Sequence, residues 1–526
     1  MSPAARRAVP SASLKTPPQQ RTAVPARPAA PPRGAVRRTG TASAAGAADS
    51  RRERDSMGEV LLPVDALFGA TTQRAVENFP VSGRTVSAEL ISAYLLLKKA
   101  CAEVNRGLRR LEKSKAEWIV AACDRILEGL ERDPGAWASH FPIDVFQTGS
   151  GTSTNMNVNE VIANVAALEA GNPVGARDPI HPNDHVNMGQ SSNDTFPTAM
   201  QVAGAVAIEG LLLPQLRRLH KALVEKEKRW DAIVKIGRTH LMDATPIRLG
   251  QEFSGYAAQV AYALRRAEEA RDRLAENLPI GGTAVGTGIN THPAFGARVA
   301  ARLAKVTGIA FREAPNHFEA QATRDCVVEA SGQLRTIAVS LSKIANDIRW
   351  LGSGPRCGLF ELSLPATQPG SSIMPGKVNP VICESVMMVA CQVVGHDTAL
   401  ALGGFGGIGS LLELNVAMPM MAENLQQSIL LLSNAAAMFV DRCIAGLEVN
   451  EAIATGTVER SLMMCTSLAP VIGYDKAAEV AKGAFASGET VRAYVLRHRL
   501  IDPETLDALL DPRSMTEPGG EGSAGG

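Results

Sequence analysis

The sequence predicts an all-α protein built around a central bundle of long helices. The clearest periodic pattern repeats apolar side chains every three or four positions over more than three heptads, at Val327, Ala330, Leu334, Ile337, Leu341, Ile344, Ile348 and Leu351. Apolar stretches of similar length occur at roughly 197–232, 251–277, 380–400 and 418–446. Strand-like alternation is scarce. Long helices of matched length pack side by side as a bundle, and a seam this long favours an oligomer.

Shorter elements are expected on both sides of the bundle. Residues 86–130 have helical character, and the turn-forming run Asp133-Pro134-Gly135 closes that stretch. The seam helix should end at Gly352-Ser353-Gly354-Pro355, because glycine and proline terminate helices. Shorter helices follow between residues 448 and 512. The Gly/Ser/Glu-rich tail after them is expected to be disordered.

Composition divides the 526 residues into a basic arm and a mildly acidic body. Residues 1–48 hold seven Arg and one Lys without any Asp or Glu, so the net charge of +1 conceals a remainder at −7. The arm also has eight Pro, fourteen Ala and no aromatic residue, which is too little apolar surface to offset the entropy lost on ordering. We therefore expect a disordered extension over 1–56 and a globular body from Met57, where translation could truly start. An organellar transit peptide is the alternative.

The sequence gives no support for secretion, a membrane span or a metal-thiolate site. No apolar h-region follows the N-terminal charges, and no run of about 18 consecutive apolar residues occurs. The eight cysteines include no C-x-x-C pair and no zinc-type spacing, so they are expected to be reduced core thiols in a cytoplasmic protein. The same dispersal disfavours an iron–sulfur cluster. Nucleic-acid binding through the basic arm would depend on non-specific charge alone.

Two segments rich in small polar side chains precede predicted helices. The first is residues 147–157, where hydroxyls and amides beside Gly149 and Gly151 offer neutral donors to an anion at a positive helix end. The second comprises residues 181–185 and 189–194. A helix cap explains one or two residues of each segment but not the clusters. Zinc binding by His181 and His185 is disfavoured, because Pro182 lies between them and no catalytic glutamate accompanies them.

Two further segments carry groups suited to proton transfer and charge stabilisation. Residues 237–243 contain His240, and imidazole is the side-chain type best suited to proton transfer near neutral pH. Residues 368–380 resemble a phosphate-binding loop but lack its glycine spacing, and Val378 replaces the Ser or Thr that would bind a metal. A glycine- and proline-punctuated loop with hydroxyls and Lys377 is instead typical of a mobile segment that excludes water and presents a cation to developing negative charge.

These four segments, in this order, resemble the active-site stretches of the fumarase/aspartase superfamily over residues 57–515. The resemblance is strongest to the class II, iron-independent fumarate hydratases, because aspartases typically carry Gln where His240 stands and often Ala where Gly376 stands. It implies a three-domain architecture with an N-terminal domain at 57–190, a helical bundle at 191–447, a small helical domain at 448–513 and a disordered tail at 514–526. It also implies a homotetramer with a twenty-helix core, whose active sites each combine segments of three subunits.

The resemblance further implies reversible hydration of fumarate to (S)-malate without a metal or organic cofactor. Ser371 would take the C3 proton, and His240, oriented by Glu384, would handle the proton of the water at C2. The residues implied to bind substrate are Ser150, Gly151, Thr152, Ser191, Ser192, Asn193, Thr239, Ser372, Lys377, Val378 and Asn379. A second dicarboxylate site would comprise His181, Pro182, Asn183 and Asp184.

Some residues depart from the fumarase pattern. Ser153-Thr154 stands where Gln-Ser is usual, Gly189 where a serine is usual, and His185 where fumarases commonly have Asp. His185 resembles the aspartase residue, so aspartate ammonia-lyase is the alternative activity. A non-catalytic helical scaffold is disfavoured, because the residues implied to act in catalysis are all present.

Overall fold

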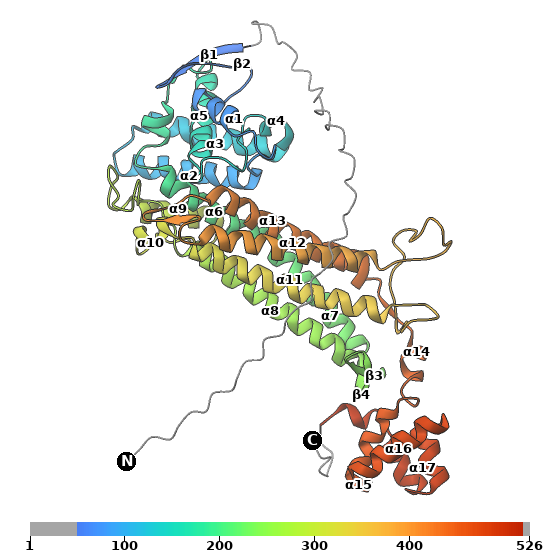
Figure 1. Cartoon of the computed structure of the whole chain (residues 1–526). Coiled ribbons are helices and arrows are strands. Elements are labelled where there is room, and N and C mark those ends of the chain that lie inside the picture. Colours follow the sequence, from blue (N-terminus) through green and yellow to red (C-terminus); the bar gives the residue numbers. More distant parts are fainter. Residues whose placement is uncertain (1–49, 519–526) are drawn as a thin grey trace, which may run out of the picture. The chain divides into compact units, whose positions relative to one another are not determined.

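The computed structural model describes residues 50–518, which belong to one compact unit made mostly of helices (Figure 1). The helices before the bundle are α1 (Ala70–Asn78), α2 (Ala88–Gly107), α3 (Lys113–Arg132), α4 (Pro134–Ala138) and α5 (Thr152–Glu169). Strands are short and pair only as antiparallel two-stranded ribbons: β1 (Ser50–Asp55) with β2 (Gly58–Pro63), β3 (Val234–Thr239) with β4 (Met242–Arg248), β5 (Leu362–Ser363) with β8 (Glu448–Val449), and β6 (Ser410–Leu411) with β7 (Leu414–Asn415). The predicted all-α class is confirmed.

The bundle consists of long helices that pack in sequence around one apolar core. Its members are the continuous segment α6 (Ser192–Ala207), η2 (Ile208–Leu212) and α7 (Leu213–Arg229), followed by α8 (Leu249–Ala275), α11 (Asp325–Leu351), α12 (Val381–Gly404) and α13 (Met418–Phe439). Helix α7 packs on α8, α8 on α11, α11 on α12, α12 on α13, and α13 on both α6 and α7. All eight residues of the predicted α11 seam are buried. The seam prediction is therefore confirmed.

The bundle has two ends, which carry different parts of the predicted site. At the α6 end, where α6, α11 and α13 begin, the backbone N–H of Met418 donates to the carbonyl of Gly149 at 3.1 Å. At the hairpin end, where α7, α11 and α13 finish, the β3–β4 hairpin reverses the chain into α8. There Lys235 Nζ of β3 lies 3.0 Å from the Glu361 carboxylate in the segment after α11. The helices thus hold the two groups of polar segments apart.

Ordered structure begins before Met57, which corrects the expected extension over 1–56. Residues 50–55 form β1, and the Arg51 guanidinium donates to the carbonyls of Pro63 at 2.8 Å and Phe68 at 2.6 Å. Arg74 of α1 pairs with Asp55 at 2.7 Å. The high charge of this segment indicates a solvated tail, whereas the side chains of Arg51 and Asp55 bond to specific partners in the fold. Residues 1–49, the rest of that predicted extension, lie outside the described residues.

The expected helix over 86–130 is divided between α2 and α3. Arg109 has a positive φ of 58°, and the carbonyl of Asn105 accepts from the backbone N–H of Arg110 at 2.9 Å, so the chain turns before α3 begins. Pro134 does not only close this region but also begins the short helix α4, which Asp133 caps by accepting from the Ala136 N–H at 3.0 Å. A left-handed arginine leaves no signal in apolar spacing.

The C-terminal part has short helices and an apolar cluster of its own. Between α8 and α11 lie α9 (Phe295–Thr307) and α10 (His317–Ala322); after α13 come η3 (Val440–Ile444), α14 (Glu451–Gly456), η4 (Leu462–Leu468), α15 (Ala469–Ile472), α16 (Tyr474–Ser487), α17 (Val491–His498), α18 (Pro503–Leu509) and η5 (Ser514–Thr516). Thr516 is buried, its Oγ1 accepts from Arg248 at 3.0 Å, and its carbonyl accepts from Gln251 at 2.9 Å. Residues 514–518 are therefore ordered, in contrast to the expected tail at 514–526. The other domain boundaries stay predictions.

Candidate active site

A cluster of hydroxyl groups lies where α5 and α6 begin side by side. Thr152 Oγ1, at the start of α5, is 2.7 Å from Ser192 Oγ at the start of α6, and Ser150 Oγ is 2.8 Å from Thr152 Oγ1. Ser191 is the N-cap of α6: its side chain accepts from the Asn193 N–H at 3.2 Å. We call Ser150, Thr152, Ser191, Ser192 and Asn193 the hydroxyl cluster. Two helix N-termini and these neutral donors suit it to bind an anion.

Gly151 allows the close approach of the two helix starts. Its φ of +72° lies in the left-handed region, and a Cβ built there would lie 1.8 Å from the ring of Phe196 in α6. Any larger residue would therefore push α5 away from α6 and separate Thr152 from Ser192. The backbone of Gly151 therefore keeps the hydroxyl groups of Thr152 and Ser192 close together.

A glycine-rich loop at 281–288 completes the surroundings of the cluster, and the sequence reasoning missed it. Asn193 Nδ2 donates to the carbonyl of Ala284 at 2.8 Å. The Asp194 carboxylate, fully buried, accepts from the backbone N–H groups of Ser191 at 2.9 Å, Gly281 at 3.1 Å and Thr283 at 2.9 Å. Burial raises the pKa of Asp194 to about 6. The density of glycines at 281–288 was the available signal, but nothing in the sequence placed this loop next to residue 193.

The histidine segment 181–185 forms a tight turn, η1 (Pro182–Val186), held by its own side chains. His181 Nδ1 accepts from the backbone N–H groups of Asn183 at 3.3 Å and Asp184 at 3.2 Å. His185 Nδ1 accepts from the backbone N–H of His181 at 2.8 Å, and its Nε2 lies 2.8 Å from Lys115 Nζ. Among residues 50–518, no group of three His, Cys, Asp or Glu side chains could hold a metal ion.

His240 lies at the hairpin end, at the tip of the β3–β4 hairpin. His240 and Leu241 both have left-handed backbones, with φ of 56° and 62°, as a two-residue hairpin turn of the primed type requires. Thr239, His240 and Leu241 are exposed. At the base of the hairpin, the buried Glu361 carboxylate pairs with Lys235 at 3.0 Å and Arg238 at 2.6 Å. This buried charge cluster fixes the hairpin while its tip reaches into solvent.

The loop at 368–380 is closed on itself and holds Ser371 in a defined environment. Gly370 N–H donates to the carbonyl of Lys377 at 2.8 Å, and Asn379 Nδ2 donates to the carbonyl of Gly370 at 2.6 Å. Ser371 Oγ accepts from the backbone N–H groups of Ile373 at 3.2 Å and Met374 at 2.9 Å. Two amide donors aimed at one hydroxyl oxygen would stabilise a negative charge on it. The loop's side chains Ser372, Lys377 and Val378 are exposed, as is Glu384 in α12.

One chain does not bring the predicted site residues together. Ser192 begins, and His240 follows, a continuous helical segment of 38 residues, which at 1.5 Å per residue spans about 57 Å. Ser371 and Glu384 flank the start of α12, at the hairpin end. Within the described part of the chain no hydrogen bond joins His240 to Ser371 or to Glu384. The site residues therefore form three separate groups: the hydroxyl cluster, the hairpin tip and the Ser371 loop.

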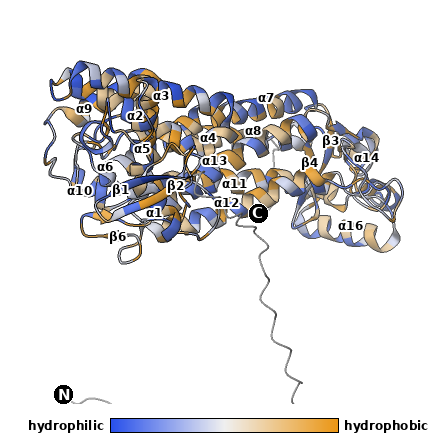
Figure 2. Cartoon of the chain, turned by 90° about the horizontal axis from the view of Figure 1, so that it is seen from above, coloured by the Kyte–Doolittle hydropathy of each residue, from blue (hydrophilic) through white to orange (hydrophobic). Residues whose placement is uncertain are grey.

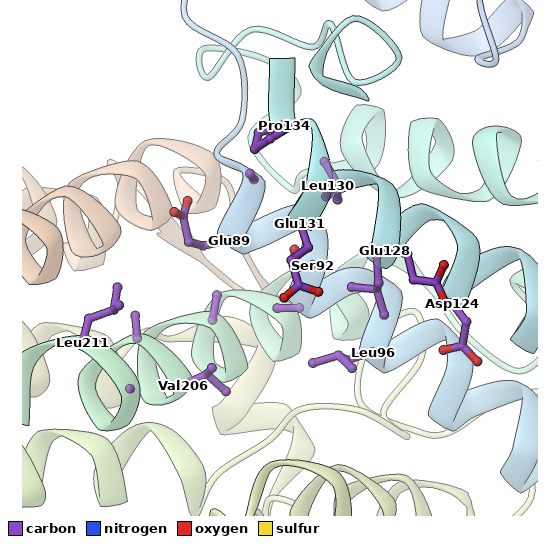
Figure 3. A pocket seen from close by; sticks show the side chains of 16 residues that line it. Glu89, Ser92, Leu96, Asp124, Glu128, Leu130, Glu131, Pro134, Val206 and Leu211 are labelled. Atoms are coloured by element: carbon purple, nitrogen blue, oxygen red, sulfur yellow. The ribbon is translucent and has the colours of Figure 1, made fainter. Parts of the chain in front are cut away.

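One large hollow of the described chain holds none of these residues. It has a volume of about 800 Å³ and lies between α2, α3 and the α6–η2 segment (Figure 3). Apolar side chains such as Leu96 and Val206 line it. The lining also includes four acidic residues, Glu89, Asp124, Glu128 and Glu131. A groove rimmed by carboxylates repels a dianion, so it does not compete with the hydroxyl cluster as the candidate site.

Comparisons with known proteins agree on one family. Residues 58–395 match the lyase family, and residues 464–517 match the fumarase C C-terminal family. Fumarate hydratase class II of Thermosynechococcus vestitus is 52% identical over 87% of this chain and 96% of its own length; the mitochondrial fumarate hydratase of Rhizopus oryzae is 50% identical over 88% and 92%. The crystal structure of a class II fumarase from Schistosoma mansoni matches with a TM-score of 0.85 at 37% identity, covering 90% of this chain and all of that one. The chain therefore belongs to the lyase family, among the class II fumarate hydratases.

Proposed function

We propose that the protein interconverts fumarate and (S)-malate by reversible hydration. The observation that carries this proposal is the environment of Ser371, whose Oγ accepts from two backbone N–H groups in a loop that also presents Lys377 and Asn379. Removing a proton from carbon beside a carboxylate needs a strong base and a stabilised dianion. Amide donors to Ser371 Oγ make a serine alkoxide accessible as that base.

In the dehydration direction, the Ser371 alkoxide takes the C3 proton of malate, and the electron pair moves into the adjacent carboxylate. Lys377 and Asn379 stabilise the charge that gathers there. His240 then gives a proton to the C2 hydroxyl. The C2–O bond breaks, water leaves, and the electron pair held in the carboxylate returns to form the C2–C3 double bond. Glu384 orients the imidazole, as carboxylates do for histidine in other catalytic pairs. The hydroxyl cluster binds the carboxylates through neutral donors.

The site is assembled from different copies of the chain in a homotetramer. About 57 Å of helix separates Ser192 from the hairpin that carries His240, so a substrate of a few ångströms reaches both only if neighbouring copies supply them. The three groups of residues then come from three subunits.

The exposed face of α12 supports such an assembly. The apolar window of α12 is only 33% buried, whereas that of the similarly apolar segment Ser192–Arg229 is 78% buried. Figure 2 colours α6, α7 and α12 by the hydropathy of their residues. Both segments are long and apolar enough to span a membrane, but so are core helices of other proteins. The outward stripe of α12 carries no charge over Met388, Cys391, Gly395, Thr398 and Leu402. Uncharged residues at helical spacing suit helix packing, and a second copy of the chain would cover them.

Two finer assignments belong to the same proposal. We place a second dicarboxylate site at His181, Pro182, Asn183 and Asp184, beside the basic pair of Lys115 and His185. We also place the protein in the cytoplasm, although the relatives include a mitochondrial enzyme. Fractionation of cells that express the chain with and without residues 1–49 tests this location. Import that depends on those residues would contradict it.

The activity is tested by following the ultraviolet absorbance of fumarate after adding (S)-malate, and separately L-aspartate, to metal-free protein. We expect fumarate to form from malate only. Formation from aspartate alone would establish the ammonia-lyase activity, which the fumarate hydratase relatives do not favour.

A further inference from the structure

A buried lysine lies behind the hydroxyl cluster, and the mechanism above does not use it. Lys98 of α2 has no exposed surface. Its Nζ donates to three carboxamide oxygens: Asn155 Oδ1 at 2.8 Å, Asn187 Oδ1 at 3.0 Å and Gln190 Oε1 at 2.9 Å. The three bonds use all the donor positions of an ammonium group, so the structure is built for the charged form of Lys98.

The charge of Lys98 is solvated but not neutralised. Within residues 50–518, no carboxylate lies within 4.0 Å of its Nζ. Burying a cation without a counter-ion costs several kcal/mol even when its hydrogen bonds are made. Next to it in sequence, Lys99 has the ordinary arrangement, an ion pair with Asp124 near the surface. The free-energy cost of burying the Lys98 charge indicates that this charge has a role in function.

The partners of Lys98 connect it to both halves of the hydroxyl cluster. Asn155 lies one helical turn after Thr152 in α5 and also accepts from Thr195 Oγ1 at 3.2 Å. Asn187 and Gln190 belong to the turn that leads into Ser191. Lys98 is therefore bonded to residues near the starts of both α5 and α6. The side chains there that would contact the substrate are all neutral.

We propose that Lys98 is a positioning residue that supplies the buried positive charge for binding the dicarboxylate dianion, acting through Asn155 and the Asn187–Gln190 turn rather than by contact. This inference rests on the proposed function. Apart from the Asp194 carboxylate, which acts on it from beyond ion-pair distance, the cation gains a counter-ion when a dianion occupies the hydroxyl cluster. It explains how a cluster of neutral side chains, in a body of net negative charge, attracts a doubly negative substrate.

The titration of Lys98 supplies a readout that packing alone would not move. Burial lowers the pKa of Lys98 to about 8. The titratable groups that act on it are Asp194 of α6, Cys123 of α3 and Cys101 of α2; α5 and the Asn187–Gln190 turn present carboxamides. Burial raises the pKa of both thiols well above its usual value, and Asp194 titrates near pH 6, so Lys98 alone of these changes charge between pH 7 and 9.5.

The test measures the dissociation constant of succinate, an unreactive dicarboxylate, by calorimetry between pH 7 and 9.5. The proteins are the full chain and its variants Lys98→Met, Lys98→Arg and, as the matched control, Lys99→Met. At pH 7 we expect Lys98→Met to bind succinate more weakly, by about tenfold or more, because it removes a buried unit charge that attracts both carboxylates at an effective dielectric constant of about 20. Lys99→Met should bind normally. The unmodified protein should lose affinity above about pH 8, and Lys98→Arg should not, because arginine stays charged.

Normal succinate binding by Lys98→Met would overturn the inference, as would the same alkaline loss of affinity in Lys98→Arg and the unmodified protein. If Lys98→Met does not fold, as thermal melting would show, the comparison of Lys98→Arg with the unmodified protein decides. Normal succinate affinity in all variants would overturn this inference without contradicting the proposed hydration activity. Absence of succinate binding by the unmodified protein overturns this inference, whereas the proposed function is overturned separately, if no fumarate forms from malate.

Discussion

The two ends of the bundle carry the polar residues of the candidate site in opposite surroundings. At the α6 end, Thr152 and Ser192 are bonded to each other and backed by buried Asp194 and Lys98. At the hairpin end, His240 and Glu384 are exposed and have no side-chain partner within the described residues. The first group is bonded within one chain, whereas the second is, in our proposal, completed by other chains. If the proposed assembly holds, the comparison teaches that folding alone builds the binding half of the site and that assembly builds the proton-transfer half.

The largest effect is expected from Ser371→Ala, because this substitution removes the base that we propose takes the C3 proton. Turnover should fall by about a thousandfold or more, while the assembly and its melting temperature stay unchanged, since the loop is exposed. Rates at saturating malate and sedimentation measure the two quantities. Ser372→Ala is the neighbouring control and should keep most of the turnover. Near-normal turnover in Ser371→Ala would remove that residue from the chemistry.

His240→Asn should lower turnover by about a hundred- to ten-thousandfold, the range of a lost general acid–base group. Asn is chosen because it tolerates the left-handed backbone at this hairpin position. Steady-state rates with malate provide the measurement, and His220→Asn in α7 is the matched control. Loss of soluble assembly, rather than of turnover alone, would show that the hairpin tip acts in structure.

Ser192→Ala should act on binding more than on turnover. It removes one hydroxyl of the bonded pair with Thr152 and leaves the backbone of α6 capped by Ser191. The KM for malate should rise by about tenfold, the effect of one lost hydrogen bond to a charged group, with a smaller change in kcat. A larger change in kcat than in KM would place Ser192 in proton transfer and remove the contrast between the two ends.

The smallest effect concerns the pH dependence of stability at the α6 end. Burial raises the pKa of Asp194 to about 6 from an ordinary value of 3.8. The folded state therefore holds this proton more tightly than the unfolded state, and the contribution of Asp194 to stability falls as pH rises from about 4 to 6. In thermal melting across this range, the stability of the full chain relative to that of Asp194→Asn should decrease as pH rises. Parallel curves would contradict the raised pKa.

Local pattern predicted the helices, and long-range contact decided the rest. The spacing of Val327 through Leu351 was enough to predict α11 because the seam repeats within one element. The motifs with Ser371 and His240 were recognisable because each is contiguous in sequence. Lys98, by contrast, reaches residues 57 to 92 positions away, and the 281–288 loop meets Asp194 only in three dimensions. The β1 strand was missed because its charges, which suggest a solvated tail, are satisfied by distant partners such as Arg74.

The central claim, that each site combines residues of different chains, is tested most directly by mixing two inactive variants. Ser371→Ala and His240→Asn proteins are unfolded together in equal amounts and refolded, and malate turnover is compared with that of each variant refolded alone. Because a site that takes Ser371 and His240 from different subunits escapes both substitutions with a probability of one half for each, we predict recovery of about a quarter of normal activity. Recovery of no activity from mixed assemblies would place both residues in one chain's site and contradict the account.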